Sequence, residues 1–378
     1  MGRVLFYRDF QGFTGGHLKV WNYFNHTLKS KDYQPYVSFT PNSLWNSTNP
    51  WSLFPQQVII GQDSPRSAEE IFTPSQQFIK DLASFPIAQD SLRCSTRETF
   101  TSSQQIVQDL SSFSKFNSSE DILFLAGLDW LRLSEEKRRN SPVPIINLIQ
   151  GFRHADPHHR CYEFLQYPAI RICVSQEIKA AIAATGIPKG KIFVIPNGID
   201  LEKFTSPRPM DWVRLPDRSP QVTIVALKQP QLARQLKLQL QATFPEIQIK
   251  MIDSLLPRHE FIQCLQESQI TIFLPLATEG FYLPALEGMA AGTLVICPDC
   301  VGNRSFCLDN WNCWRPEYKL ASIFQAVEQA LVADSSKQQE IHRHAQLTVA
   351  KHDLIAERQA FLEILANVEQ LWREVLTE

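Results

Sequence analysis

Short apolar runs alternate along this chain with longer segments that mix polar and apolar residues. Ten of the runs are rich in Val, Ile and Phe and have the length of a buried strand: residues 3–9, 34–39, 121–127, 143–149, 170–175, 191–197, 221–227, 247–253, 269–276 and 293–298. Buried strands separated by helical segments are typical of parallel sheets, because each parallel connection must cross over a face of the sheet. We therefore expect an α/β chain of parallel strands and crossover helices.

The length of 378 residues is too great for one ordinary core and fits about two domains of roughly 150 to 200 residues each. Residues 201–220 contain four prolines and no periodicity, which indicates a linker. We predict a first domain over residues 1–205 and a second over residues 206–360. Both would be Rossmann-like and doubly wound, with the carboxyl ends of their sheets facing across a cleft that binds the ligand.

Residues 41–119 differ from the rest because they are rich in Ser, Gln, Asn and Pro. This composition predicts an irregular insertion with short helices. Such an insertion either shapes substrate specificity or elaborates the surface without a role in binding, and the sequence favours neither.

The last helical segment, residues 357–376, places four large apolar side chains at helical spacing: Phe361, Leu365, Val368 and Trp372. This stripe predicts a helix that packs against another part of the molecule.

The formal net charge is -2, so we expect neither nucleic acid nor an anionic membrane as the main partner. The sequence offers no support for a peripheral membrane contact. The first residues turn polar after a short apolar stretch, and no run is long enough to span a bilayer. We expect a cytoplasmic protein, so the sequons at Asn46 and Asn117 carry little weight.

Eight cysteines are scattered along the chain, and several fall in runs that read as buried strands. Reduced thiols packed in the core are the simplest account. Cys297 and Cys300 form a C-x2-C pair near Cys307 and Cys313, but no second pair follows, so we expect no metal site.

Two carboxylates, Glu279 and Glu287, flank Pro284 in the apolar stretch EGFYLPALEGMAAG. Pro284 suits the first turn of a helix, which places Glu279 in the loop before that helix and Glu287 about one turn inside it. The positive end of the helix and its free amides suit an anionic ligand, and carboxylates suit sugar hydroxyls. Taken alone, the pair is equally well explained by a local cap or salt bridge and a solvated loop residue.

The same stretch resembles the E-x7-E element of retaining glycosyltransferases of the GT-B fold, in the large group often called family 4. Two further segments resemble that family in the same order: FTGGHLKVWNYF near the start, and IPNGIDLEKF at residues 195–204. The resemblance extends over nearly the whole chain. It implies that the C-terminal helix, residues 361–378, crosses back to the N-terminal domain, which would be the acceptor side.

The resemblance also suggests donor-binding residues. Gly15 and Gly16 open a helix after the first strand, where backbone can approach a phosphate without a side chain between them. They do not form the G-x-G-x-x-G pattern of dinucleotide sites, and a plain turn would look the same. The loop before the second carboxylate adds further candidates for the donor, which are Gly280, Phe281, Tyr282 and Leu283.

The basic pair that grips the donor diphosphate in this family is altered here. The family has an arginine followed five positions later by a lysine, whereas this chain has Lys228 and, six positions on, Arg234. Both can neutralise a diphosphate, although lysine acts as a point charge and arginine as a fork.

Two other places depart from the family pattern. Gln150 stands where a histidine near the reacting sugar is usual, and His154 is a candidate replacement or an ordinary loop residue. Arg304 lies in a run that lacks the usual acidic residue, and we leave it outside the candidate site.

The activity that the resemblance implies is transfer of a hexose-like sugar from a nucleotide diphosphate to an acceptor hydroxyl, with retention of configuration. Glu279, Lys228 and His154 are the candidate catalytic residues, and Glu287 would hold the donor ribose. We expect no metal and no cofactor beyond the donor itself. The acceptor would be a glycan, a lipid-linked intermediate or a small molecule, as in glycan biosynthesis.

Three alternatives remain open at the level of sequence. A nucleotide-sugar epimerase on the same fold would need acid and base groups at the sugar carbon. A binding or scaffold protein could have kept the fold after losing catalysis, which the altered basic pair would allow. A phosphorylase-like enzyme is disfavoured because no cofactor lysine motif is apparent.

Overall fold

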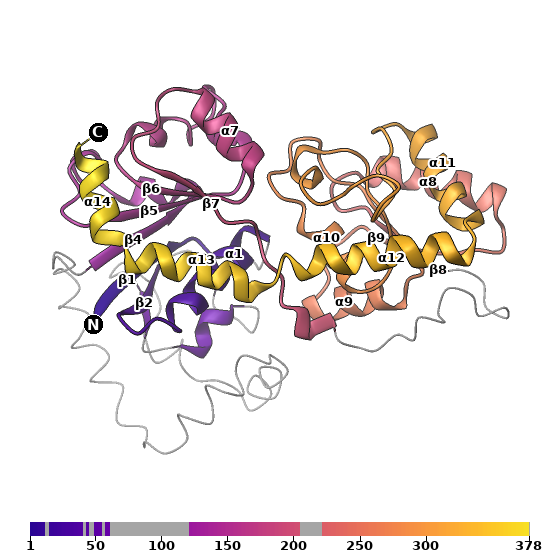
Figure 1. Cartoon of the computed structure of the whole chain (residues 1–378), viewed down its shortest axis with the longest axis horizontal. Coiled ribbons are helices and arrows are strands. Elements are labelled where there is room, and N and C mark those ends of the chain that lie inside the picture. Colours follow the sequence, from indigo (N-terminus) through magenta and orange to yellow (C-terminus); the bar gives the residue numbers. More distant parts are fainter. Residues whose placement is uncertain are drawn as a thin grey trace, which may run out of the picture.

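The structure is a computed structural model that describes residues 1–11, 15–40, 43–44, 49–54, 57–60, 121–204 and 221–377. Figure 1 shows two α/β bodies lying side by side, with the last helices running from one body to the other. The predicted linker lies outside the described residues from 205 onward, and so does most of the predicted insertion.

The first body is built on a seven-stranded sheet in the order β3-β2-β1-β4-β5-β6-β7, and every neighbouring pair in it is parallel. Its strands are β1 (Gly2–Arg8), β2 (Tyr33–Phe39), β3 (Val58–Ile60), β4 (Asp121–Ala126), β5 (Ile145–Ile149), β6 (Ile170–Cys173) and β7 (Ile192–Val194). The strand order reverses between β1 and β4, which is where a doubly wound sheet opens a crevice at its carboxyl edge.

Helices and 3-10 turns connect these strands. They are α1 (Gly15–Thr27), η1 (Pro50–Leu53), η4 (Gly127–Arg132), α6 (Glu135–Arg139), η5 (Phe152–His154), η6 (Glu163–Gln166), α7 (Gln176–Ala184) and η7 (Leu201–Phe204). Strands β4, β5 and β6 are buried at every position, because helices cover a parallel sheet on both faces.

The second body has a four-stranded parallel sheet in the order β11-β10-β8-β9. Its strands are β8 (Gln221–Val225), β9 (Gln248–Ile252), β10 (Ile270–Phe273) and β11 (Leu294–Ile296). Its helices are α8 (Pro230–Thr243), α9 (Arg258–Glu267), α10 (Leu283–Ala290), η9 (Val301–Asn303), α11 (Leu320–Val332) and α12 (Ser335–Ala350).

The two faces of this second sheet belong to different hydrophobic clusters. One cluster joins the sheet to α8 and α11 through residues such as Leu236 and Ile323. The other contains Leu265 of α9 and Leu286 of α10 and is continuous with the core of the first body. The second body therefore has helices on both faces of its sheet, and the layer formed by α9 and α10 packs towards the first body.

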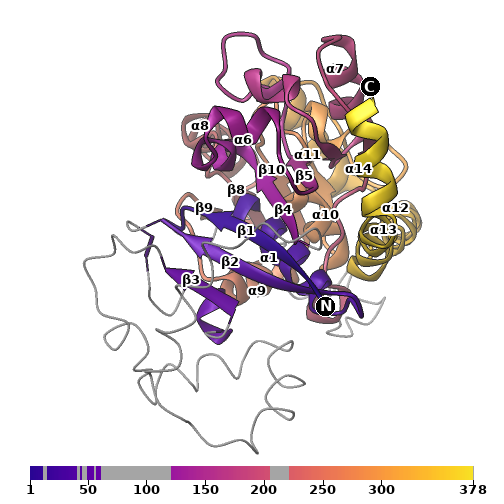
Figure 2. The same cartoon turned by 90° about the vertical axis from the view of Figure 1, so that its left-hand side faces the viewer.

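The last two helices, α13 (Leu354–Ala366) and α14 (Val368–Thr377), lie on the first body (Figures 1 and 2). Phe361 packs its ring against Tyr23 at 4.7 Å and against Phe124 at 5.9 Å, and Glu374 forms an ion pair with Lys191. The predicted crossing of the chain end is confirmed. All four residues of the predicted stripe are buried, although a break at Asn367 divides the segment into two helices.

All ten predicted strands are present, each within a few residues of its predicted bounds. The sequence did not predict β3, which lies inside the predicted insertion and is only three residues long. The domain boundaries at 205/206 and 360/361 stay predictions. Glu357 of α13, which lies before the second boundary, already contacts Lys19 and His26 of the first body.

Three further properties concern only the described part of the chain. No helix there is long and apolar enough to cross a membrane. All seven cysteines in it are unpaired and buried. No group of three or more His, Cys, Asp or Glu residues there has the arrangement of a metal site.

Candidate functional site

Two side chains predicted for the site meet at the carboxyl edge of the second sheet. Lys228 follows β8 and Glu279 follows β10, and these adjacent strands flank the point where the strand order reverses. The Lys228 Nζ lies 3.7 Å from Glu279 Oε1. The lysine side chain is 51% exposed and the glutamate side chain 19%, so both remain open to a ligand.

The loop that carries Glu279 leads directly into α10. Pro284 lies in the first turn of that helix, as predicted. The Leu276 amide donates to Glu279 Oε1 at 3.4 Å, while the Tyr282 amide donates to the Gly302 carbonyl at 2.9 Å. Phe281 stacks on Phe306 at 4.9 Å, so its ring is buried.

This loop offers a ligand its backbone more than its side chains. Phe281, Tyr282 and Leu283 are all buried. The Leu283 amide bonds the Phe281 carbonyl at 3.1 Å, whereas within the described residues the amides of Gly280 and Phe281 have no hydrogen-bond acceptor. A ligand at this loop would therefore meet these two amides together with the Glu279 carboxylate.

Gly280 joins the two bodies. A β-carbon at this position would overlap the carbonyl oxygen of Gln150 and would lie 2.9 Å from Gly151 Cα. Gln150 and Gly151 follow β5 of the first sheet, so the loops at the carboxyl edges of both sheets touch here through backbone. Only glycine permits so close an approach.

The predicted glycine turn lies beside the same junction. Gly15 and Gly16 begin α1, and a β-carbon at either would meet no atom within 4 Å. Gln150 Nε2 donates to the Gly16 carbonyl at 3.5 Å. The structure thus brings the glycine turn, the Gln150 loop and the Glu279 loop together from three distant parts of the sequence.

We expect Gly280→Ala to separate the two loops, because the added methyl would meet backbone that cannot move aside without shifting a strand end. Such overpacking costs about 1 to 3 kcal/mol. Thermal unfolding and nucleotide-sugar binding should both show the loss. Gly151→Ala is the matched control, since a β-carbon there has no atom within 4 Å. Equal behaviour of the two variants would show that the contact is not required.

Glu287 is buried, with 2% of its side chain exposed, and both of its oxygens bond Arg258. The Arg258 Nη1 donates at 3.0 Å, and Nη2 donates to the second oxygen. Burial lowers the pKa of Arg258, but the Glu287 carboxylate outweighs burial and holds that pKa above its ordinary value. Glu287 therefore forms a salt bridge that joins the start of α9 to the middle of α10, and its role towards a ribose stays a prediction.

Two other predicted residues make no hydrogen bond or ion pair with Glu279 within the described part of the chain. Arg234 is exposed on α8, and it has no ion pair within the part of the chain that the structure describes. His154 is 1% exposed; its Nδ1 lies 3.2 Å from the Gly151 carbonyl, and its buried Nε2 has no partner among the described residues. Burial lowers the pKa of His154 to about 3, so this imidazole is neutral near pH 7. The predicted roles of both residues remain untested.

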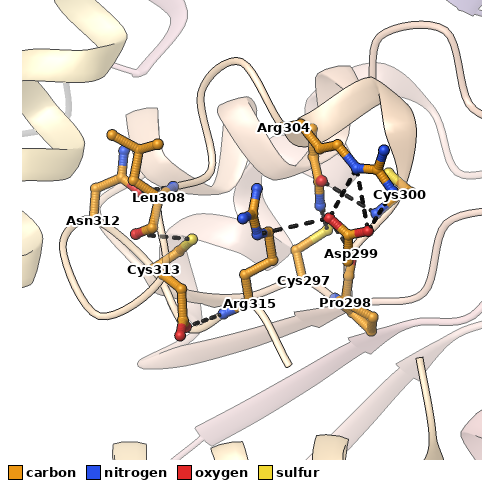
Figure 3. A network of polar contacts seen from close by, with 11 residues as sticks. Cys297, Pro298, Asp299, Cys300, Arg304, Leu308, Asn312, Cys313 and Arg315 are labelled. Atoms are coloured by element: carbon orange, nitrogen blue, oxygen red, sulfur yellow. Dashed lines mark hydrogen bonds and ion pairs between the residues drawn. The ribbon is translucent and has the colours of Figure 1, made fainter. Parts of the chain in front are cut away.

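The loop after β11 supports the Glu279 loop from the other side. Asn303 Nδ2 donates to Cys297 Sγ at 3.1 Å and to the Pro298 carbonyl at 2.9 Å. Figure 3 shows Asp299 between Arg304 and Arg315, with Arg304 Nη2 donating at 2.6 Å. The hydrogen bond from Arg304 lowers the pKa of Asp299. These contacts fix the turn that presents the Gly302 carbonyl to Tyr282.

Comparison with known proteins decides the fold. Sucrose-phosphate synthase from Thermosynechococcus elongatus superposes with a TM-score of 0.60 at 13% identity, covering 100% of both chains. The chain has the GT-B fold. HepE from Anabaena, solved with UDP and glucose, gives a TM-score of 0.62 at 14% identity, covering 97% of this chain and 100% of that one.

Two further comparisons extend this result. A TarM variant from S. aureus, in complex with fondaparinux, alpha-GlcNAc-glycerol and UDP, gives a TM-score of 0.63 at 9% identity, covering 96% of this GT-B chain and 99% of that chain. The family model described as Glycosyltransferase Family 4 matches residues 144–203, which run from β5 to η7. No curated protein matches the chain in sequence.

Some residues of the site could not be found from the sequence. Arg258 lies in no motif and is 29 positions away from Glu287, so only the fold shows that the two are paired. The sequence singled out Gln150 only because it stands where the family usually has a histidine. In the structure, Gly280 packs against the backbone of Gln150. Both contacts are long-range, and no local pattern predicts them.

Proposed function

We propose that this chain is a retaining glycosyltransferase that moves a sugar from a nucleotide diphosphate to an acceptor hydroxyl. The observation that carries the proposal is the Lys228 and Glu279 pair at the switch point of the second sheet. A cation and a carboxylate side by side suit a diphosphate and a sugar side by side. The neighbours solved with UDP support the nucleotide, and the family match from β5 to η7 supports the transferase class.

In this proposal the departing diphosphate is stabilised electrostatically. Lys228 neutralises charge on the phosphates, the amides of Gly280 and Phe281 donate to an oxygen, and Arg234 adds a second cation from α8. Glu279 orients the sugar hydroxyls and stabilises positive charge at the anomeric carbon. The leaving phosphate accepts the proton of the acceptor hydroxyl on the same face of the sugar, which retains the configuration. The proposal invokes no metal because these groups supply the charge.

Glu287 has a defined part in the proposal. Each carboxylate oxygen has two lone pairs, and Arg258 occupies one on each. The remaining lone pairs can accept hydrogen bonds from the ribose hydroxyls when the nucleotide binds beside α10. Glycans, lipid-linked sugars and small molecules all remain candidate acceptors.

A panel of nucleotide sugars tests the proposal. A donor that binds only the folded chain must stabilise it and so raise the unfolding temperature. At a donor concentration of one hundred times Kd, the free energy of unfolding rises by about 2.7 kcal/mol. We expect at least one nucleotide sugar to do so in the wild type and to lose that effect in Lys228→Ala. Proton NMR of the product would then give the anomeric configuration. If no nucleotide sugar stabilises the chain, or if the product is inverted, the proposal is wrong.

A further inference from the structure

The carboxyl edge of the first sheet carries three arginines. Arg8 ends β1, Arg132 ends η4 after β4, and Arg153 lies in η5 after β5. These are three adjacent strands, because the sheet order is β1-β4-β5. Arg8 is buried and ion-paired with Asp129, whereas Arg132 and Arg153 are exposed.

The acids of this edge are already engaged. Asp129 bonds Arg8 and also accepts the Ala126 amide at 2.9 Å. Asp9 accepts from Gln11 and Thr40, each at 2.9 Å. Asp156 accepts the His158 amide at 2.9 Å.

Neither exposed arginine has an acidic partner among these groups. Throughout the described ranges, Arg132 and Arg153 form no ion pair. Neither guanidinium is therefore in direct contact with a carboxylate of the described residues.

Both arginines are held in place by uncharged groups. The Arg132 Cζ lies 5.1 Å from the centroid of the Tyr7 ring, a cation-π contact. Arg153 lies over Gly127, where a β-carbon would be 2.9 Å from its Nη2 and where φ is +59°. Because these contacts involve the Tyr7 ring and the Gly127 backbone, the N–H donors of both guanidinium groups stay available to a ligand.

Two titratable groups beneath this edge are uncharged. Burial raises the pKa of the Cys161 thiol, and Arg153 and Arg160 oppose this shift without outweighing it. Burial and, to a smaller extent, Arg8 together lower the pKa of His17 to about 4. Both imidazole and thiol are thus neutral near pH 7, and neither offsets the arginines.

The edge also lies next to the reaction site of the proposed function. Gly280 touches Gln150 and Gly151, and Arg153 follows two residues after Gly151. Resting on that proposed function, we propose that the acceptor carries a phosphate or carboxylate group and that Arg132 and Arg153 bind it. The planar guanidinium group can donate two parallel hydrogen bonds to a phosphate or to a carboxylate. An uncharged sugar could not form this bidentate ion pair.

Calorimetric titration of the full chain with glucose, glucose 6-phosphate and glucuronate tests this proposal. Hydrogen bonds to charged groups correspond to about 10- to 100-fold in affinity. We expect at least one of the two anionic sugars to bind more tightly than glucose by that factor. The double variant Arg132→Gln with Arg153→Gln should lose the preference, and its thermal unfolding would confirm that it folds.

Two control variants separate this site from others. Arg139→Gln removes an exposed arginine that is paired with Glu135 at 2.7 Å, and it should bind the anionic sugars as the wild type does. Lys319→Gln, which changes an exposed lysine of the second body that is paired with Glu317 at 2.7 Å, should also keep their binding. Binding that survives the double variant, or binding lost in either control variant, would overturn the proposal. So would the absence of any preference over glucose together with the absence of binding to anionic lipid vesicles.

A vesicle-binding experiment shows whether the anion belongs to a sugar or to a lipid. Vesicles of phosphatidylcholine with phosphatidylglycerol, compared with phosphatidylcholine alone, show whether the arginines hold a lipid phosphate. Binding to the anionic vesicles alone, lost in the double variant, would keep the anion site but assign it to a lipid-linked acceptor. Nucleotide-sugar binding by the same variants is measured separately. Its absence from the wild type would contradict the transferase proposal without deciding whether the arginines bind an anion.

Discussion

Replacing Glu357 with alanine should lower the free energy of unfolding by about 3 to 5 kcal/mol, because it leaves a buried cation without its partner. The Glu357 carboxylate accepts from Lys19 Nζ, from the Gly198 amide and, at 3.1 Å, from His26 Nε2. Lys19 is 1% exposed, His26 2% and Glu357 3%. In the variant the lysine would keep the Gly198 carbonyl, at 3.3 Å, but would lose its carboxylate partner.

The position of Glu357 explains why the effect should reach the whole molecule. It lies on α13, while Lys19 and His26 lie on α1, and Gly198 belongs to the first crossing between the bodies. The two crossings also pair directly, since the Ile199 amide donates to the His352 carbonyl at 2.9 Å and the Leu354 amide to the Ile199 carbonyl at 3.0 Å. One carboxylate therefore ties together the helix of the glycine turn and both crossings.

Chemical denaturation at pH 7 measures this effect, with Glu363→Ala as the matched control. Glu363 is an exposed glutamate on the same helix, and its loss should cost less than about 0.5 kcal/mol. Replacing both members of the pair, as in Lys19→Met with Glu357→Leu, should restore much of the stability, because no buried charge is left unpaired. A Glu357→Ala variant as stable as the control would show that the buried network does not support the fold.

The same network predicts how stability depends on pH. Burial raises the pKa of Glu357, but Lys19 and His26 outweigh burial, so the pKa lies below the ordinary value of 4.5. Burial lowers the pKa of His26 below 6.5. Both groups bind protons more readily in the unfolded chain than in the folded one. The free energy of unfolding therefore decreases as the pH is lowered, first below pH 6.5 and again below pH 4.5. We expect this acid loss to be smaller in the double apolar variant.

The strands and the buried face of the last helical segment were predictable because their information is local, whereas the crossing of that segment to the first body was implied by the family resemblance. A run such as residues 294–296 is apolar throughout, since helices cover both faces of its sheet. The stripe from Phe361 to Trp372 likewise shows that one face of the last segment is buried. The break at Asn367 did not show, because the apolar spacing continues across it.

The candidate site was predictable only where a motif is contiguous. Glu279, Pro284 and Glu287 share one stretch, so their places in loop and helix followed from the sequence. The partners of these residues come from elsewhere: Lys228 from the end of β8, Arg258 from the start of α9 and Gln150 from the other body. The burial of His154 likewise comes from the fold, because no local pattern around a loop histidine indicates how far it is exposed.

The second large effect concerns catalysis. Under the proposed function, Glu279→Gln should lower kcat by about 10²- to 10³-fold, because one charged group that stabilises the transition state is lost. The amide keeps an oxygen that can accept the Leu276 amide, so the loop conformation should persist. Only the negative charge beside Lys228, whose Nζ lies 3.7 Å away, is removed.

Kinetics with a donor found in the nucleotide-sugar panel measure the change. Nucleotide diphosphate affinity should stay within a few-fold of the wild type, because the proposal assigns Glu279 to the sugar and Lys228 to the phosphates. Lys228→Ala should instead weaken that affinity. Glu260→Gln, which alters a half-exposed glutamate on α9, controls for a change of net charge. A Glu279→Gln enzyme with more than half of the wild-type kcat would remove Glu279 from the chemistry. The pair with Lys228 would then serve only to hold the loop at the edge of the second sheet.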